Sequence, residues 1–186
     1  MRGPSPRCCP TTRPRTWCCG ATRRRCTTSS RRPEEDHHGH RGGAMTLHWT
    51  KEDTPRWDAD KQRLFGDAGL ASVGMDRPAR GAHLPDEWWR ASDDAGDTVG
   101  YGWLDAEWGD AQITFLADPA RRGQGIGGFI VDRLEREAAA RGLNYIYNVV
   151  PPTHPDPAWM THWLTLHGFV AGTGDLRRQV RTDPQA

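Results

Sequence analysis

The stretch that decides the fold runs from residue 111 to residue 141 and reads AQITFLADPARRGQGIGGFIVDRLEREAAAR. At its start, Ile113 and Phe115 alternate with polar neighbours, which is the period-two pattern of a strand. Further on, an apolar residue recurs at every fourth position, at Ile126, Ile130, Leu134 and Ala138. This period predicts an amphipathic helix that stops near Gly142. The stretch therefore predicts a strand, a glycine-rich loop and a helix in direct succession.

The residues before this stretch predict antiparallel strands. Aromatic and β-branched residues separated by acidic turns predict a meander of three strands, over 88–92, 98–104 and 111–117. Upstream, we expect a short strand at 47–50 and a helix that begins near Thr54. Glycines and prolines leave 66–85 without a period, so we expect that segment to form a surface loop.

The residues after the helix predict a return to the sheet. Residues 143–150 are almost all apolar or aromatic, as expected of an interior strand covered on both faces. A strand, a crossover helix and a second strand form a parallel unit. A helix over 158–166 and strands at 169–171 and 176–181 follow. The predicted fold class is α/β of the α+β kind: a mixed central sheet, with an antiparallel meander followed by a parallel strand–helix–strand unit and helices on both faces.

The glycine-rich loop predicts an anion site. The first N–H groups of a helix lack partners and lie at the positive end of its dipole, so a diphosphate can accept several of them. Gly123, Gly125 and Gly128 also fit the Gly-x-Gly-x-x-Gly pattern of dinucleotide-binding proteins. That fold requires the motif after its first strand and an acid after the next strand. Here antiparallel strands precede the motif, and no acid occurs between Asn148 and Asp156, which argues against a dinucleotide.

In this context the sequence resembles the GNAT acetyltransferases, whose signature is Gln/Arg-x-x-Gly-x-Gly/Ala between a strand and a helix. Arg122, Gly125 and Gly127 occupy the signature positions. The strand before the loop and the later Gly168-Phe169 pair lie where the family has them. The resemblance covers about 88–180 in an unbroken order of elements.

The resemblance implies an acetyl-coenzyme A dependent N-acetyltransferase that moves an acetyl group to an amine of a small molecule or a protein. The pyrophosphate of the coenzyme would bind the backbone N–H groups of the loop, and the pantetheine arm would lie in the gap between the strands 111–117 and 143–150. The implied coenzyme contacts are Leu116, Ala117, Arg122, Gly123, Gln124, Gly125, Ile126, Gly127 and Gly128. No metal is expected.

Acetyl transfer needs a neutral amine, so a general base or an ordered water must take its proton. Glu107 and Asp110, at the start of the central strand, are candidate bases, although both also suit an ordinary turn. His154, in a proline-rich loop, is a third candidate that is also typical of a surface residue. The tetrahedral intermediate needs a donor for its oxyanion, and a main-chain N–H near Leu116 is expected to supply it.

The general acid stays unassigned at this stage. Leu164 stands where many family members have a tyrosine that protonates the departing thiolate, and Pro157 stands where they have an asparagine. A water, Tyr147, His154 or His162 would have to serve. This departure keeps a second hypothesis open, in which the protein binds acetyl-coenzyme A without turnover, as a sensor or a partner module.

The first 44 residues differ in composition from the rest. They hold all five cysteines and ten arginines against three acids, whereas residues 45–186 hold 21 acids against 15 basic residues. A segment so poor in large apolar residues is expected to be disordered. It is interpreted as a nucleic-acid arm, as a zinc site or, preferably, as an upstream stretch read through a misplaced start, with Met45 opening the real domain (45–186). The cysteine spacing does not resemble a zinc site.

The remaining composition bears on partners and location. No run approaches the length of a membrane span and no apolar signal-peptide core follows the first arginines, so we expect a cytoplasmic protein without a membrane partner. The acidic balance of 45–186 favours a cationic amine as acceptor. Nucleic acid is not expected as a partner, and a homodimer is one option for the assembly.

Overall fold

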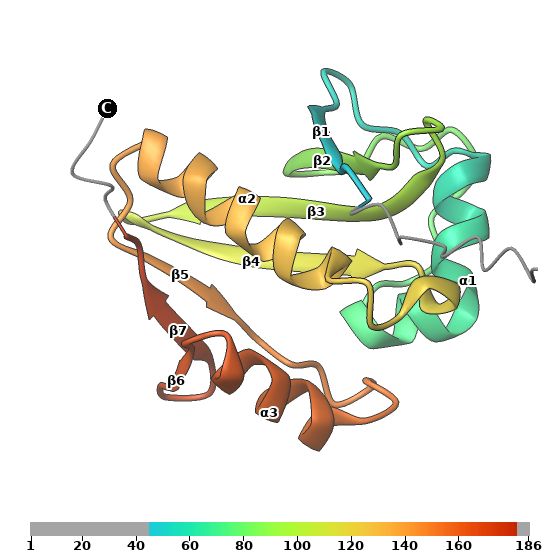
Figure 1. Ribbon diagram of the computed structural model, residues 1–186. Helices are drawn as coiled ribbons and strands as arrows, with labels where there is room; N and C mark the ends of the chain where they lie inside the picture. The colour runs from blue at the N-terminus through green and yellow to red at the C-terminus, as the bar shows by residue number, and fades with distance from the viewer. Residues whose placement is uncertain (1–44, 182–186) are drawn as a thin grey trace, which may run out of the picture. The chain divides into compact units, whose positions relative to one another are not determined.

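The computed structural model describes residues 45–181. The interpretations of residues 1–44 lie outside this part. Seven strands form one sheet in the order β1-β2-β3-β4-β5-β7-β6 (Figure 1). All neighbouring strands are antiparallel except β4 and β5, which are parallel. The strands are β1 (His48–Lys51), β2 (Glu87–Ser92), β3 (Thr98–Glu107), β4 (Asp110–Ala117), β5 (Tyr145–Asn148), β6 (Val170–Ala171) and β7 (Leu176–Gln179). The predicted fold class is confirmed.

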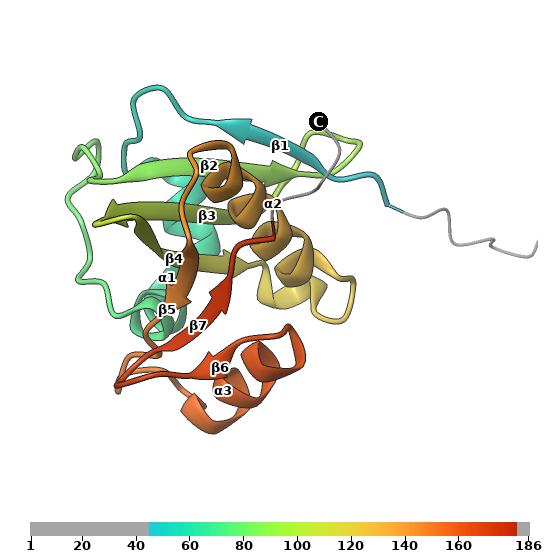
Figure 2. The ribbon, with the colours of Figure 1, turned by 90° about the vertical axis from the view of Figure 1, so that its left-hand side faces the viewer.

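Three helices cover the two faces of the sheet, namely α1 (Ala59–Val73), α2 (Ile126–Ala140) and α3 (Pro157–Leu166). Figures 1 and 2 show α1 and α2 on opposite sides of the strands. The four residues that predicted α2 are all buried in one core, to which α3 adds Leu164. On the other face, Leu64, Phe65 and Leu70 of α1 pack against aromatic residues of β2 and β3. The periodicity of α2 is thus confirmed as a core-facing stripe.

Two elements differ most from the prediction. The helix α1 begins at Ala59 and not near Thr54, with Asp58 as its N-cap. It continues to Val73 through part of the segment expected to be a loop, because Gly66 takes a non-helical φ of 50° and lets the helix resume after a kink. Beyond the kink, Leu70 is buried against the sheet, which offsets the cost of the break. The strand β5 covers only 145–148 instead of 143–150, and Tyr145 is 37% exposed. One face of β5 is therefore open, where burial on both faces was expected.

The helix α2 lies very close to β3 because that strand carries glycines under it. A Cβ atom at Gly100 would lie 2.6 Å from Cδ1 of Ile130 and 2.8 Å from the carbonyl oxygen of Leu116. A Cβ atom at Gly102 would lie 2.7 Å from Cγ2 of Ile130. Such distances leave no room for a side chain, so the position of α2 depends on these glycines.

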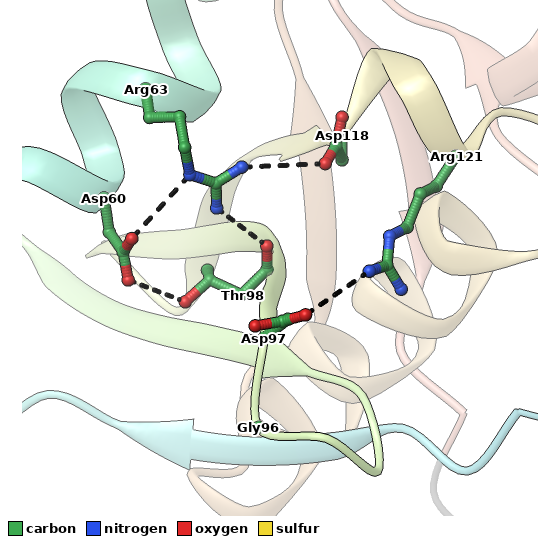
Figure 3. A pocket seen from close by; sticks show the side chains of 7 residues that line it. All are labelled: Asp60, Arg63, Gly96, Asp97, Thr98, Asp118 and Arg121. Carbon is green, nitrogen blue, oxygen red and sulfur yellow. Dashed lines mark hydrogen bonds and ion pairs between the residues drawn. The ribbon is translucent and has the colours of Figure 1, made fainter.

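A polar pocket lies beside the chain that connects β4 to α2, and charged side chains line it (Figure 3). Arg63 of α1 lies 3.9 Å from Asp118, the residue that follows β4. Arg121, in the short 3₁₀ helix η1 (Pro119–Arg121), donates to Asp93 in the β2–β3 turn and lies 3.9 Å from Asp97. These contacts fix the chain just before the glycine-rich loop.

None of the three helices within residues 45–181 is long and apolar enough to cross a membrane. In the same part of the chain, no group of three or more His, Cys, Asp or Glu side chains lies in an arrangement that could hold a metal ion.

We predict that Gly100→Ala destabilises the protein by about 1–3 kcal/mol, because the new methyl group overfills the contact with α2. Urea unfolding followed by tryptophan fluorescence measures the change. The double variant Gly100→Ala/Ile130→Val should recover part of the loss beyond the sum of the single changes, because valine lacks the Cδ1 atom that obstructs Cβ. Strict additivity would contradict this steric account.

The hydrogen bond from Arg121 holds the pKa of Asp93 below its ordinary value. A carboxylate whose pKa is lower in the folded than in the unfolded protein stabilises the fold at pH values above the unfolded-state pKa. This contribution is lost as the pH falls through the folded-state pKa. Asp93→Asn should therefore be less stable than the wild type at pH 7, with a difference that narrows below about pH 4. Thermal unfolding of both proteins at several pH values measures the difference in stability. A difference that does not change with pH would assign the effect to hydrogen bonds alone.

Candidate functional site

The strands β4 and β5 pair over only three residues and then separate. Residues 110–112 of β4 are the Cα partners of residues 145–147 of β5. At the next position, Nδ2 of Asn148 donates to the carbonyl oxygen of Ile113 at 2.8 Å, in place of a ladder hydrogen bond. Beyond this point the strands diverge, as Figure 1 shows. The second half of β4 therefore has an edge without a partner strand.

The alternation of the backbone decides which groups of β4 face this gap. The carbonyl of Ile113 is directed toward β5, whereas the N–H of Asp118 donates to Val99 of β3. Because the main-chain groups of successive strand residues point to opposite sides, those of Phe115 and Ala117 face the gap and those of Leu116 face β3. Phe115 was not among the expected coenzyme contacts.

The glycine-rich loop presents a continuous run of free backbone donors. Gly123 and Gly125 take φ values of 77° and 78°, and a Cβ atom at either would meet nothing within 4 Å. Gly125 is the N-cap of α2. Within residues 45–181, no group accepts a hydrogen bond from the backbone N–H groups of residues 122–128. The buried side chain of Ile126 anchors the start of α2 in the core.

Gly127 and Gly128 also allow α3 to pack closely against the start of α2. A Cβ atom at Gly127 would lie 3.2 Å from the ring of Trp163, and one at Gly128 would lie 3.3 Å from the ring of His167. These rings are stacked with centroids 3.7 Å apart, and Trp163 also contacts Phe115 at 5.4 Å. The glycines therefore let α3 pack beside the start of α2.

The two consecutive arginines before the loop have different roles. Arg121 is held by Asp93 and Asp97. The side chain of Arg122 is exposed and has no ion pair or hydrogen bond to any described residue. Of the two guanidinium groups, only that of Arg122 is free to meet an anion at the loop.

A cavity occupies the gap between the diverging strands. Its walls come from the end of α1, from β4, from the end of β5 with the chain that follows, and from α3. They consist of Ser72, Val73, Gln112, Thr114, Phe115, Asn148, Val149, Val150, Pro151 and Met160. None of these wall residues carries an acidic, basic or imidazole group. Polar contacts in the cavity must therefore come from hydroxyl, carboxamide and main-chain groups.

The candidate bases lie near the cavity but do not line it. Glu107 and Asp110 are Cα partners on either side of the β3–β4 turn, and Asp110 lies two residues before Gln112 of the cavity wall. His154 accepts a hydrogen bond at Nδ1 from the N–H of Asp156 at 3.0 Å. A water molecule would be needed between any of these side chains and a substrate in the cavity.

The candidates for the general acid are equally spread. Leu164, at the position of the usual tyrosine, is fully buried in the core and does not line the cavity. Its side chain has no proton to donate. Tyr147 is the Cα partner of Gln112, on the open side of β5. His162 is exposed on α3.

The sequence reasoning missed Asn148 and Phe115 as parts of the site. A carboxamide at the end of an otherwise apolar strand is a signal that could have drawn attention to Asn148. No sequence signal distinguishes the direction of the main-chain groups of Phe115 from those of Leu116, because that direction depends on strand register.

Comparisons with known proteins bear on the family and the fold. The model of the Acetyltransferase (GNAT) family matches residues 44–159. No curated protein matches the sequence. Among solved structures, YhhK from Escherichia coli bound to coenzyme A has a TM-score of 0.56 and 12% identity, and the match covers 73% of this chain and 99% of that chain.

Two further structures share the fold with similar TM-scores and sequence identities. The N-acetylglutamate synthase from Neisseria gonorrhoeae, complexed with coenzyme A and L-arginine, has a TM-score of 0.53 and 13% identity, with coverage of 73% of this chain and 33% of that chain. The GNAT domain of PAT from S. lividans has a TM-score of 0.52 and 14% identity, with coverage of 73% and 97%. Together with the family match over most of the sheet and α2, these observations lead to one conclusion: the chain belongs to the acetyltransferase (GNAT) family.

Proposed function

We propose that this protein is an N-acetyltransferase that binds acetyl-coenzyme A and transfers its acetyl group to an amine. Membership of the family supports acyl-coenzyme A dependent acetyl transfer in general. The observation that carries the proposal is the run of unpaired N–H groups over 122–128, which leads to the unpaired edge of β4 and the cavity beside it.

The residues of the loop fit a pyrophosphate. Several N–H groups at the positive end of a helix dipole can donate to one diphosphate, and the absence of Cβ atoms at Gly123 and Gly125 lets it approach. The free guanidinium of Arg122 adds a charge-assisted donor. We assign the coenzyme contacts to residues 122–128 and to the main-chain groups of Phe115 and Ala117 on the edge of β4. The expected contact Leu116 is not among them, because its main-chain groups face β3.

The edge of β4 fits the pantetheine arm. Main-chain donors and acceptors that lack a partner strand are satisfied by a ligand that lies along them as a strand would. When bound, acetyl-coenzyme A supplies an activated acetyl thioester. The N–H of Phe115 faces the gap and is the donor that we assign to the oxyanion of the acetyl carbonyl.

The proton of the amine has to leave the cavity through water, because no wall residue can accept it as a base. We keep Glu107 and Asp110 as the candidate final acceptors, since both lie on the open face beside Gln112, and His154 as the third. Polar wall residues such as Thr114 and Gln112 can orient the amine by hydrogen bonds. Rate enhancement then rests mainly on orientation and on the oxyanion donor.

The second hypothesis, a protein that binds acetyl-coenzyme A without turnover as a sensor or partner module, rests only on Leu164 at the position of the usual tyrosine, and the family match does not favour it.

Turnover separates these two functions. We predict that acetyl-coenzyme A is consumed, and free thiol released, when a panel of primary amines is added to the full chain. A thiol-reactive dye follows the reaction, and mass spectrometry of the amine identifies the product. The sensor function predicts binding of acetyl-coenzyme A without thiol release for every amine of the panel.

Gly125→Asp should lower the affinity for coenzyme A by roughly 10- to 100-fold, because a carboxylate would stand where the pyrophosphate accepts hydrogen bonds. Calorimetric titration measures the affinity. Gly174→Asp is the matched control, since Gly174 also has a positive φ and open space at Cβ but lies in the turn before β7. Equal affinities of the two variants would show that the loop is not the coenzyme site.

A further inference from the structure

Asn148 ends a strand that the following residues would continue. These residues are Val149 and Val150, whose β-branched side chains favour strand structure, whereas asparagine is rare in strands. The strand β5 nevertheless ends at Asn148, and the side chain of Val149 is 43% exposed. The other edge of β5 stays paired, since Asn148 is the Cα partner of Leu176 in β7. Pairing is therefore lost only on the side of β4, and this one-sided end needs a specific cause.

The side chain of Asn148 supplies that cause. In a parallel ladder that continued by one step, the carbonyl oxygen of Ile113 would accept from the backbone N–H of Val149. Within residues 45–181 no such hydrogen bond occurs. Nδ2 of Asn148, a residue that is only 5% exposed, donates to that carbonyl oxygen instead, at 2.8 Å. Asparagine side chains can take the place of main-chain donors in this way.

One further step of pairing would also occupy the donor that we assign to the oxyanion. The continued ladder would direct the backbone N–H of Phe115 to the carbonyl oxygen of Val149. Because the amide of Asn148 satisfies the buried carbonyl of Ile113, the main chain of Val149 is not drawn to β4. The N–H of Phe115 therefore still faces the gap.

We propose, on the basis of the acetyltransferase function above, that Asn148 is a positioning residue for acetyl transfer. Its amide ends the pairing of β4 and β5 at Ile113 and thereby keeps the N–H of Phe115 available to the acetyl carbonyl. Asn148 contacts no reacting group in this role, because it acts through the main chain of β4.

Hydrogen exchange of the free protein tests the geometric part of this role. In the full chain, Asn148→Val removes the amide donor and introduces a side chain that favours strand structure. We expect the amide of Phe115 to exchange about tenfold more slowly than in the wild type, because it gains a main-chain acceptor. The midpoint of urea unfolding should stay nearly the same, because the carbonyl of Ile113 exchanges one donor for another. NMR of the ¹⁵N-labelled protein measures the exchange.

Steady-state kinetics test the catalytic part. At saturating acetyl-coenzyme A, kcat of Asn148→Val should fall by about 10- to 100-fold, which is less than the loss for complete removal of an oxyanion donor. KM for the amine should change by less than about twofold, since the N–H of Phe115 acts on the acetyl group in the transition state and not on the bound amine. The readout is thiol release with the primary amine that the wild type acetylates fastest.

Asn144→Val is the matched control. Nδ2 of Asn144 donates to the carbonyl oxygen of Gly109 at 3.3 Å. These two residues directly precede β5 and β4, so this variant removes a like hydrogen bond at the opposite, paired end of the same strands. It should change neither kcat nor the exchange of Phe115.

Unchanged or faster exchange of Phe115 in Asn148→Val, together with lower stability, would give Asn148 a purely structural role and overturn this inference. An unchanged kcat would overturn it as well, while turnover by the wild type would keep the acetyltransferase function in place. If the wild type acetylates no amine, the proposed function fails, and the exchange of Phe115 still decides whether Asn148 holds the strands apart. Should the valine prevent folding, Asn148→Ala removes the same amide, and slower exchange of Phe115 is expected there as well.

Discussion

The backbone of β4 loses its parallel partner after Gln112, and the exposed strand edge that results is the constraint on which the site depends. Main-chain groups cannot stay unsatisfied inside a protein without a cost in free energy, so this edge must meet water or a ligand. Asn148 marks the end of pairing by giving its side-chain amide to Ile113, which satisfies the last buried carbonyl before the strands separate. The cavity and the free edge both begin at that residue.

The position of the glycine-rich loop, the other part of the site, follows from the packing of α2. Glycines in β3 allow Ile130 to lie directly on the strand, so the helix axis is fixed relative to the end of β4. The ion pair of Arg121 with Asp93 holds the connecting chain. Consequently the N–H groups of residues 122–128 are presented in one place, as a continuation of the free edge of β4. A ligand that joins a diphosphate to a peptide-like arm can contact the loop and the strand edge at the same time, whereas either part alone would contact only one of them.

Much of this arrangement could be predicted from the sequence, because local patterns determine it. The four-residue period that ends at Ala138 gave α2, and the glycines after Arg122 indicated the anion site. The end of α1 was missed because Gly66 reads as a helix stop, whereas tertiary burial of Leu70 lets the helix resume. The length of β5 was overestimated, since an apolar run does not reveal where a strand loses its partner. For the same reason the roles of Phe115 and Asn148 became apparent only from the register of β4 and β5.

The most direct test of the central claim is the NMR spectrum of backbone amides during titration of the ¹⁵N-labelled full chain with acetyl-coenzyme A. The account predicts that the amide resonances of residues 122–128, together with those of Phe115 and Ala117, shift on binding and that their hydrogen exchange slows. Residues of the β2–β3 turn should stay unchanged. Binding of the coenzyme without any change at residues 122–128 would contradict the account.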